Sequence, residues 1–138
     1  MWLFGKKREP AKELLESCKT IAIVGLSDKP ERPSYQVAQY LQKNSYHIIP
    51  VNPMVTEVLG QNAYPNLGSI PVPIDLVNVF RAEDELAKLF DEALELRVPA
   101  IWLQPGLRCA EGEQRALMEG IPVFTDHCIM IEHRRLFG

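Results

Sequence analysis

The sequence predicts a single α/β domain of the Rossmann-like type, with three layers in which helices cover both faces of a doubly wound parallel sheet of five to six strands. Short, almost continuous apolar segments alternate along the chain with helical patterns, as expected for strands buried on both faces. The 138 residues suffice for one domain with a sizeable core, and no linker-like stretch divides them. We expect right-handed crossovers and a strand order similar to 3-2-1-4-5-6.

Six apolar segments are predicted to be strands. The first reads Thr-Ile-Ala-Ile-Val and ends at Gly25. A segment around Val58 is the weakest of the six, because it lies in a stretch rich in Gly, Asn and Pro. In chain order, the predicted strands are residues 20–24, 47–51, around 58, 75–79, 99–103 and 121–124.

Helices are predicted between these strands from apolar spacing and from the residues at their ends. The clearest is 83–96, where apolar residues recur at i, i+3, i+4, i+7 and i+8. Pro10 suits the first position of a short leading helix, and Ser34 and Asp126 are residue types that cap helix starts. Gly120 suits a helix end. The predicted helices begin at Pro10 and cover 34–43, 83–96, 109–119 and 126–136.

The composition argues against several classes of protein. A net charge of −3 with no basic stripe argues against nucleic-acid binding. No apolar run approaches the roughly 18 residues that cross a membrane. Residues 1–9, apolar first and then basic, resemble a flexible tail more than a secretory signal. Three scattered cysteines form no disulfide framework, so we expect a reduced, cytoplasmic protein.

The segment from Gly25 to Ser34 is the first candidate binding site, because ligands of doubly wound sheets bind at the carboxyl ends of the strands. The helix that follows offers unpaired backbone N–H groups, expected at residues 35–37, and the positive end of its dipole. Such a helix start binds anions such as a diphosphate. Lys29 and Arg32 add positive charge nearby. The alternative interpretation is a solvated basic loop before an ordinary capped helix.

This loop does not match the common nucleotide-binding motifs. Only Gly25 of a G-x-G-x-x-G pattern is present, and no Gly-Lys-Ser/Thr follows as in a Walker A loop. The second predicted strand ends in Asn52-Pro53, where an NAD-binding protein has an acidic residue for the ribose hydroxyls. The motif comparison argues against an NAD(P)-dependent oxidoreductase, which stays an alternative.

Several segments in order resemble a known family. Residues 21–34 read Ile-Ala-Ile-Val-Gly-Leu-Ser-Asp-Lys-Pro-Glu-Arg-Pro-Ser and look like the opening of the small stand-alone CoA-binding proteins. Those proteins are similar to the nucleotide-binding domain of the succinyl-CoA synthetase α subunit and of ADP-forming acyl-CoA synthetases. The resemblance covers nearly all of residues 15–136. Its further segments are Ile49-Pro-Val-Asn-Pro53, Ala63-Tyr-Pro-Asn-Leu67, Val79-Phe-Arg81, Trp102-Leu-Gln-Pro-Gly106 and Asp126-His-Cys-Ile-Met-Ile-Glu132.

The resemblance implies a site for CoA or an acyl-CoA at the strand ends. The diphosphate would lie against the first loop and helix start, with one of the two loop cations at the 3′-phosphate. The adenosine would lie near residues 51–53 and 80–81, and the pantetheine arm would run past 104–106 toward Cys128. The implied contact residues are Gly25, Leu26, Ser27, Lys29, Arg32, Pro33, Ser34, Tyr35, Val51, Asn52, Pro53, Phe80, Arg81, Gln104, Gly106 and Cys128.

The resemblance also implies a non-catalytic binding module, regulatory or serving a partner enzyme. The similar synthetases use a phosphorylated histidine on a second domain, and this chain stops at Gly138. A homodimer is another expected association. Cys128, at a helix start that favours the thiolate, is either a packing residue or able to form a mixed disulfide with CoA. The spacing of the histidines and cysteines matches no metal-binding motif, so no metal site is expected.

Overall fold

The computed structural model describes residues 2–3, 6–7 and 9–138. Near its start, β1 (Trp2–Leu3) pairs antiparallel with β2 (Lys6–Lys7). The predicted flexible tail, residues 1–9, falls partly outside the described residues, and its flexibility stays a prediction. None of the helices in the described part of the chain has the length and apolar character that crossing a membrane requires.

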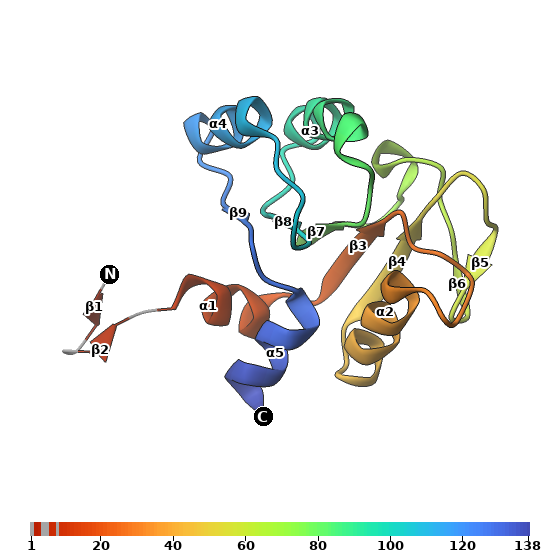
Figure 1. Ribbon diagram of the computed structural model, residues 1–138, viewed down its shortest axis with the longest axis horizontal. Helices are drawn as coiled ribbons and strands as arrows, with labels where there is room; N and C mark the ends of the chain where they lie inside the picture. The colour runs from red at the N-terminus through yellow and green to blue at the C-terminus, as the bar shows by residue number, and fades with distance from the viewer. Residues whose placement is uncertain (1, 4–5, 8) are drawn as a thin grey trace.

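The centre of the fold is a five-stranded sheet in which all neighbouring strands run parallel (Figure 1). This confirms the predicted doubly wound α/β class. Helices lie on both faces of the sheet, so each strand is buried on two sides, as its apolar sequence requires. The strands, in order across the sheet, are β4 (His47–Val51), β3 (Thr20–Val24), β7 (Leu76–Val79), β8 (Ile101–Leu103) and β9 (Val123–Phe124).

The predicted strand around Val58 does not join this sheet. It forms β5 (Glu57–Val58), which pairs antiparallel with β6 (Gln61–Asn62) in a separate hairpin. The two residues between them, Leu59 and Gly60, both have positive φ, as in a tight two-residue turn. The chain therefore folds back on itself at this point. The expected strand order, 3-2-1-4-5-6, makes this segment the outermost strand beside β4, and that prediction is wrong.

Helices α1 (Pro10–Ser17), α2 (Pro33–Lys43) and α5 (Ile129–Phe137) cover one face of the sheet, and α3 (Leu86–Glu95) and α4 (Ala110–Met118) cover the other (Figure 1). Short 3-10 turns occur at η1 (Leu67–Ser69) and η2 (Glu83–Glu85). The helix predicted at 83–96 thus opens as a 3-10 turn. Its first three residues are acidic and exposed, so they lack the apolar face that holds α3 on the sheet.

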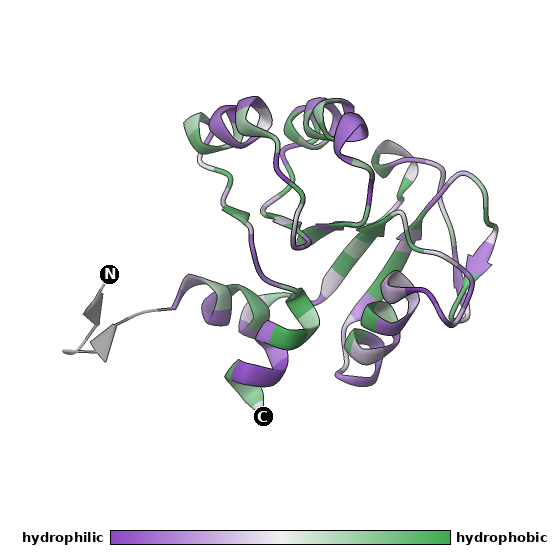
Figure 2. Cartoon of the chain, viewed as in Figure 1, coloured by the Kyte–Doolittle hydropathy of each residue, from purple (hydrophilic) through white to green (hydrophobic). Residues whose placement is uncertain are grey.

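Strand side chains alternate between two apolar cores. Val24 of β3 packs in the core under α3 and α4, and Ile23 packs in the core under α1, α2 and α5. Figure 2 shows the hydrophobic character of β3 and β4 between these layers. In the core under α1, α2 and α5, the buried Trp102 stacks on Phe124 with ring centroids 5.0 Å apart. Trp102 therefore has a packing role in this core.

Helix α5 is held at its start and near its middle. At its start, the indole Nε1–H of Trp102 donates to the carbonyl oxygen of His127 over 2.8 Å. Farther along, the buried His133 ring lies 2.8 Å, Nδ1 to Oη, from Tyr40 of α2, and burial lowers the pKa of His133. Asp126 is not the predicted helix cap. It adopts φ +70°, and Cys128 precedes the first helical residue instead.

Candidate functional site

The strand order reverses at β3, which lies between β4 and β7. After β3 the chain turns to α2 on one face, and after β7 it turns to α3 on the other (Figure 1). Diverging connections of this kind leave a crevice above the carboxyl ends of the two strands. The residues that follow β3, β4 and β7 therefore form the candidate site.

Gly25 holds the three strand ends together. Its N–H donates to the carbonyl oxygen of Val51 over 2.8 Å, and the N–H of Phe80 donates to the carbonyl oxygen of Val24 over 2.8 Å. Gly25 has φ +85°, and a Cβ atom at this position would clash with the carbonyl oxygen of Phe80. Only glycine permits both the positive φ and this close approach of two backbones.

Ser34 is not the N-cap of α2, contrary to the prediction. The helix begins at Pro33, and the preceding Arg32 caps it without a side-chain hydrogen bond. Proline suits the first helical position because its φ is already helical and an N–H is not needed there. The buried Oγ of Ser34 instead accepts the N–H of Ser27 over 3.0 Å, and the Oγ of Ser27 accepts the N–H of Lys29. The loop is thus closed on the helix.

Five backbone N–H groups in this segment have no hydrogen-bond partner within residues 9–138. They belong to Leu26, Asp28, Glu31, Ser34 and Tyr35. The prediction of an unpaired amide at Gln36 is wrong, because the Gln36 N–H donates to the carbonyl oxygen of Arg32 over 3.2 Å. The exposed cations of Arg32 and Lys29 lie in the same segment. Unpaired amides at a helix start beside two cations are suited to bind an anion.

Asn52 joins the loops that follow β3 and β4. Its Nδ2 donates to the carbonyl oxygen of Leu26 over 3.0 Å, and its Oδ1 accepts the N–H of Met54 over 2.9 Å. A carboxylate at this position could not donate to the Leu26 carbonyl. The absence of an acidic residue after β4 therefore has a structural reason here, and Asn52 positions the loop that contains the unpaired amides.

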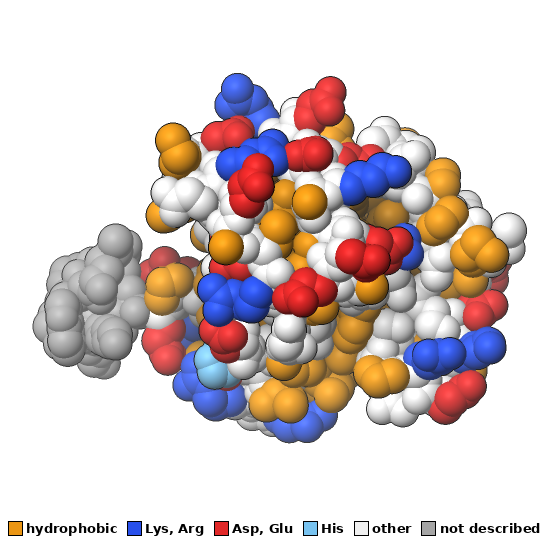
Figure 3. All heavy atoms as spheres, turned by 45° about the horizontal axis from the view of Figure 1, so that its top comes forward, with side chains coloured by type: hydrophobic (Ala, Val, Ile, Leu, Met, Phe, Trp, Pro, Cys, Tyr) orange, Lys and Arg blue, Asp and Glu red, His pale blue; other side chains and the backbone are white. Residues whose placement is uncertain are grey.

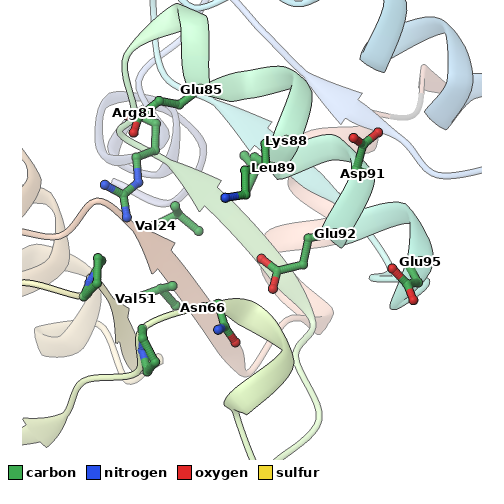
Figure 4. A pocket seen from close by; sticks show the side chains of 12 residues that line it. Val24, Val51, Asn66, Arg81, Glu85, Lys88, Leu89, Asp91, Glu92 and Glu95 are labelled. Carbon is green, nitrogen blue, oxygen red and sulfur yellow. The ribbon is translucent and has the colours of Figure 1, made fainter.

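A cleft of about 600 Å³ opens beside these loops, on the α3 side of the strand ends (Figure 4). Its apolar lining comes from Val24 and Val51 at the ends of β3 and β4, from Leu89 of α3 and from Pro53 and Pro65. Figure 3 shows that hydrophobic side chains on this side of the molecule lie between acidic and basic ones. The volume is in the range of small-molecule sites, about 300–1,000 Å³.

The charged side chains that line the cleft differ in their partners. Arg81 and Lys88 point into it (Figure 4), and neither makes an ion pair in the part of the chain that the structure describes. Asp91, in contrast, pairs with Arg115. The Glu92 carboxylate accepts the backbone N–H groups of residues 67 and 68, each over 3.3 Å. Two cationic groups thus face the cavity without an ion-pair partner among the residues that the structure describes.

The remaining predicted residues lie farther along the same edge and do not line the cleft. Buried Gln104 follows β8, and its Oε1 accepts the N–H of Ile129 over 3.2 Å, which joins β8 to the start of α5. Half-buried Cys128 and Phe80 pack against the core under α5, and Gly106 lies exposed in the loop. Adjacent strands are about 4.8 Å apart, so the edge from β3 to β8 spans about 10 Å.

The comparisons with known proteins agree with this architecture. The family model described as CoA binding domain matches residues 19–134. The chain belongs to this CoA-binding domain family. It is 44% identical over 122 residues to the Bacillus subtilis (strain 168) protein YneT, covering 88% of this chain and 90% of YneT.

Two solved structures resemble this CoA-binding domain closely. The structure of cell-free ID.343 from Thermus thermophilus has a TM-score of 0.88 at 39% identity, with 91% of this chain and 96% of that chain covered. A hypothetical protein from Pyrococcus horikoshii OT3 has a TM-score of 0.89 at 34% identity, with 93% and 90% covered. The fold of the domain and the family predicted from its motifs are confirmed.

Sequence reasoning missed part of the cleft of this CoA-binding domain. Of the predicted site residues, Val51, Pro53 and Arg81 line it. Lys88 and Leu89 were not predicted, because they belong to the amphipathic α3, where no motif distinguishes a lining residue from an ordinary surface or core residue. Only the packing of α3 beside the ends of β3 and β4 brings them to the cleft.

The cysteines of the CoA-binding domain are free thiols in different surroundings. Burial, followed by the nearby charge of Asp75, raises the pKa of Cys18 to about 12, so this thiol is protonated and unreactive at neutral pH. Cys109 packs against the core under α3 and α4. Cys128 is half-buried at the start of α5, on the edge that carries the candidate site.

Proposed function

We propose that the protein binds coenzyme A, free or acylated, at the carboxyl ends of its parallel strands. The observation that carries the proposal is the set of unpaired amides in the loop and helix start after β3, which belong to Leu26, Asp28, Glu31, Ser34 and Tyr35. Such a set of donors favours a diphosphate, since each bond to a charged oxygen contributes about 1.5–3 kcal/mol where water is excluded. Membership in the CoA-binding domain family supports CoA as its source.

The rest of the ligand is proposed to extend along the same edge. The cleft beside Val51 and Pro53 has apolar walls and a volume suited to the adenosine. On the other side, the pantetheine arm would pass Gln104 and Gly106 toward Cys128. The order of the strands supports this path, because β7, β8 and the start of α5 follow one another away from the loop.

We further propose a binding module and not an enzyme, with a regulatory role or a partner enzyme that uses the bound CoA. The histidine placements support this. His133 is buried against Tyr40, and His127 is exposed while its carbonyl oxygen anchors α5.

We propose a cytoplasmic location because the three cysteines are free thiols, which suit a reducing compartment.

Thermal unfolding with and without ligands tests the proposal. We expect CoA and acetyl-CoA to raise the melting temperature, because a ligand at a hundredfold excess over its Kd adds about 2.7 kcal/mol to the free energy of unfolding. NAD and NADP should leave it unchanged. A clear rise with NADP and none with CoA would contradict CoA binding and favour the oxidoreductase alternative.

Cys128 supports a second candidate function, which is thiol–disulfide exchange with CoA disulfide. The thiolate of Cys128 would attack one sulfur of CoA disulfide, forming a protein–CoA disulfide and releasing the other half as CoA thiolate, so no further oxidant is needed. The position of this free thiol at the start of α5, at the end of the proposed pantetheine path, favours the idea.

Intact-mass spectrometry after incubation with CoA disulfide measures this reaction. We expect one CoA adduct on the wild type and none on Cys128→Ser, whereas Cys109→Ser should react like the wild type. An adduct that persists in Cys128→Ser, or its absence from the wild type, would leave Cys128 with a packing role alone.

A further inference from the structure

The cleft beside β3 and β4 has different charges at its two ends. Arg81, which follows β7, and Lys88, on α3, direct their cationic groups into it near the ends of the strands, and Glu95 lies at the opposite end (Figure 4). Among the described residues, these two cations have no ion-pair partner. Arg81 is half-buried, so a charge there gains more from a bound anion than it would in open solvent.

Two of the four carboxylates that line the cleft interact with groups other than these cations. Asp91 is paired with Arg115, and Glu92 accepts two backbone N–H groups of η1. Glu85 also lines the cleft and would oppose an anion there. The Arg81 and Lys88 groups nevertheless converge from two elements on one volume, an arrangement that suits a ligand with one compact, highly charged group.

We propose that Arg81 and Lys88 together bind the 3′-phosphate of CoA and make the cleft selective for 3′-phosphorylated adenosine. The inference rests on the proposed CoA function. A phosphate monoester carries about −1.5 to −2 charges at pH 7, whereas each phosphate of a diphosphate bridge carries fewer. Arginine can bind two phosphate oxygens at once, and lysine adds a point charge.

The chemistry of CoA requires two separate anion sites. Its 5′-diphosphate and 3′-phosphate leave the same ribose at different carbons, so one group of donors cannot hold both. The unpaired amides around Ser34 serve the diphosphate, and the cationic pair in the cleft serves the monoester. Lys29 and Arg32, which the resemblance implies for the 3′-phosphate, are exposed on the α2 side and do not line the cleft.

Isothermal titration calorimetry with CoA and with dephospho-CoA tests the assignment. The two ligands differ only in the 3′-phosphate, which dephospho-CoA lacks. We expect the wild type to bind CoA about a hundredfold more tightly than dephospho-CoA, since two charge-assisted interactions of about 1.4 kcal/mol each correspond to two factors of ten in affinity. In Lys88→Met, CoA affinity should fall about tenfold while dephospho-CoA affinity stays within about twofold of the wild type. Lys43→Met, at the far end of α2, is the matched control and should bind both ligands normally.

The possible results separate this inference from the proposed function. Equal wild-type affinities for CoA and dephospho-CoA would overturn the 3′-phosphate assignment and leave CoA binding intact. A Lys88→Met variant that loses affinity for both ligands equally would also overturn it, because the lysine would then act on a part of the ligand that both share. If neither ligand binds the wild type, the proposed function fails as well.

Discussion

An Arg32→Asp variant is expected to bind CoA about a hundredfold more weakly than the wild type and yet to unfold at a higher temperature. Arg32 is the N-cap of α2 and makes no side-chain hydrogen bond to the helix. An aspartate there can accept the N–H of Ser34 or Tyr35, which stabilises a helix start by about 0.5–2 kcal/mol. The same bond would occupy an amide that the diphosphate needs, and it would place a negative charge beside the ligand.

The expected loss of affinity follows from the same groups. One or two charge-assisted bonds, each contributing about 1.5–3 kcal/mol, would be lost, and about 2.7 kcal/mol corresponds to a hundredfold change in Kd. Titration calorimetry measures the affinity and scanning calorimetry the melting temperature.

Two matched variants separate charge from capping at Arg32. Arg32→Ala removes only the cation and should weaken CoA binding moderately without raising the melting temperature. Arg32→Asn can cap the helix without a negative charge, so its affinity should lie between those of the Ala and Asp variants. Wild-type CoA affinity in Arg32→Asp would show that the amides at the start of α2 do not hold the diphosphate.

A Gly25→Ala variant is expected to lower the free energy of unfolding by roughly 3 kcal/mol and to reduce CoA binding with it. The added methyl would clash with the carbonyl oxygen of Phe80, part of a backbone that cannot swing aside as a flexible side chain can. Overpacking costs about 1–3 kcal/mol, and the positive φ of 85° adds about 1–2 kcal/mol for a non-glycine residue. Relief of the clash would move the loop and its unpaired amides.

Gly60→Ala is the matched control for Gly25→Ala. Gly60 also has a positive φ, +78°, but a Cβ there would meet no atom within 4 Å. Its cost should be the backbone strain alone, about 1 kcal/mol, with CoA affinity unchanged. Urea unfolding of both variants measures the difference. Equal losses of stability would mean that the contact between Gly25 and Phe80 is unimportant.

Features that depend on residues close together in the sequence were predictable from it. The apolar runs at 20–24 and 47–51 form β3 and β4 with the predicted bounds, because a strand buried on both faces needs apolar residues throughout. The first helix begins at Pro10 as predicted, and Gly120, with φ +75°, follows α4. Helix starts were less predictable. Ser34 and Asp126 are both good capping types, yet neither is a cap.

By itself, the sequence determined the fold class, the glycine-ended first strand and the loop with its two cations, since each is recorded in short local patterns. The tertiary structure alone decided that Ser34 closes this loop on Ser27, and that Lys88 shares a cleft with Arg81. It also decided that the segment around Val58 pairs in a hairpin outside the main sheet. These features arise from contacts between separate parts of the chain, and their free energies depend on how the elements pack, which no local pattern specifies.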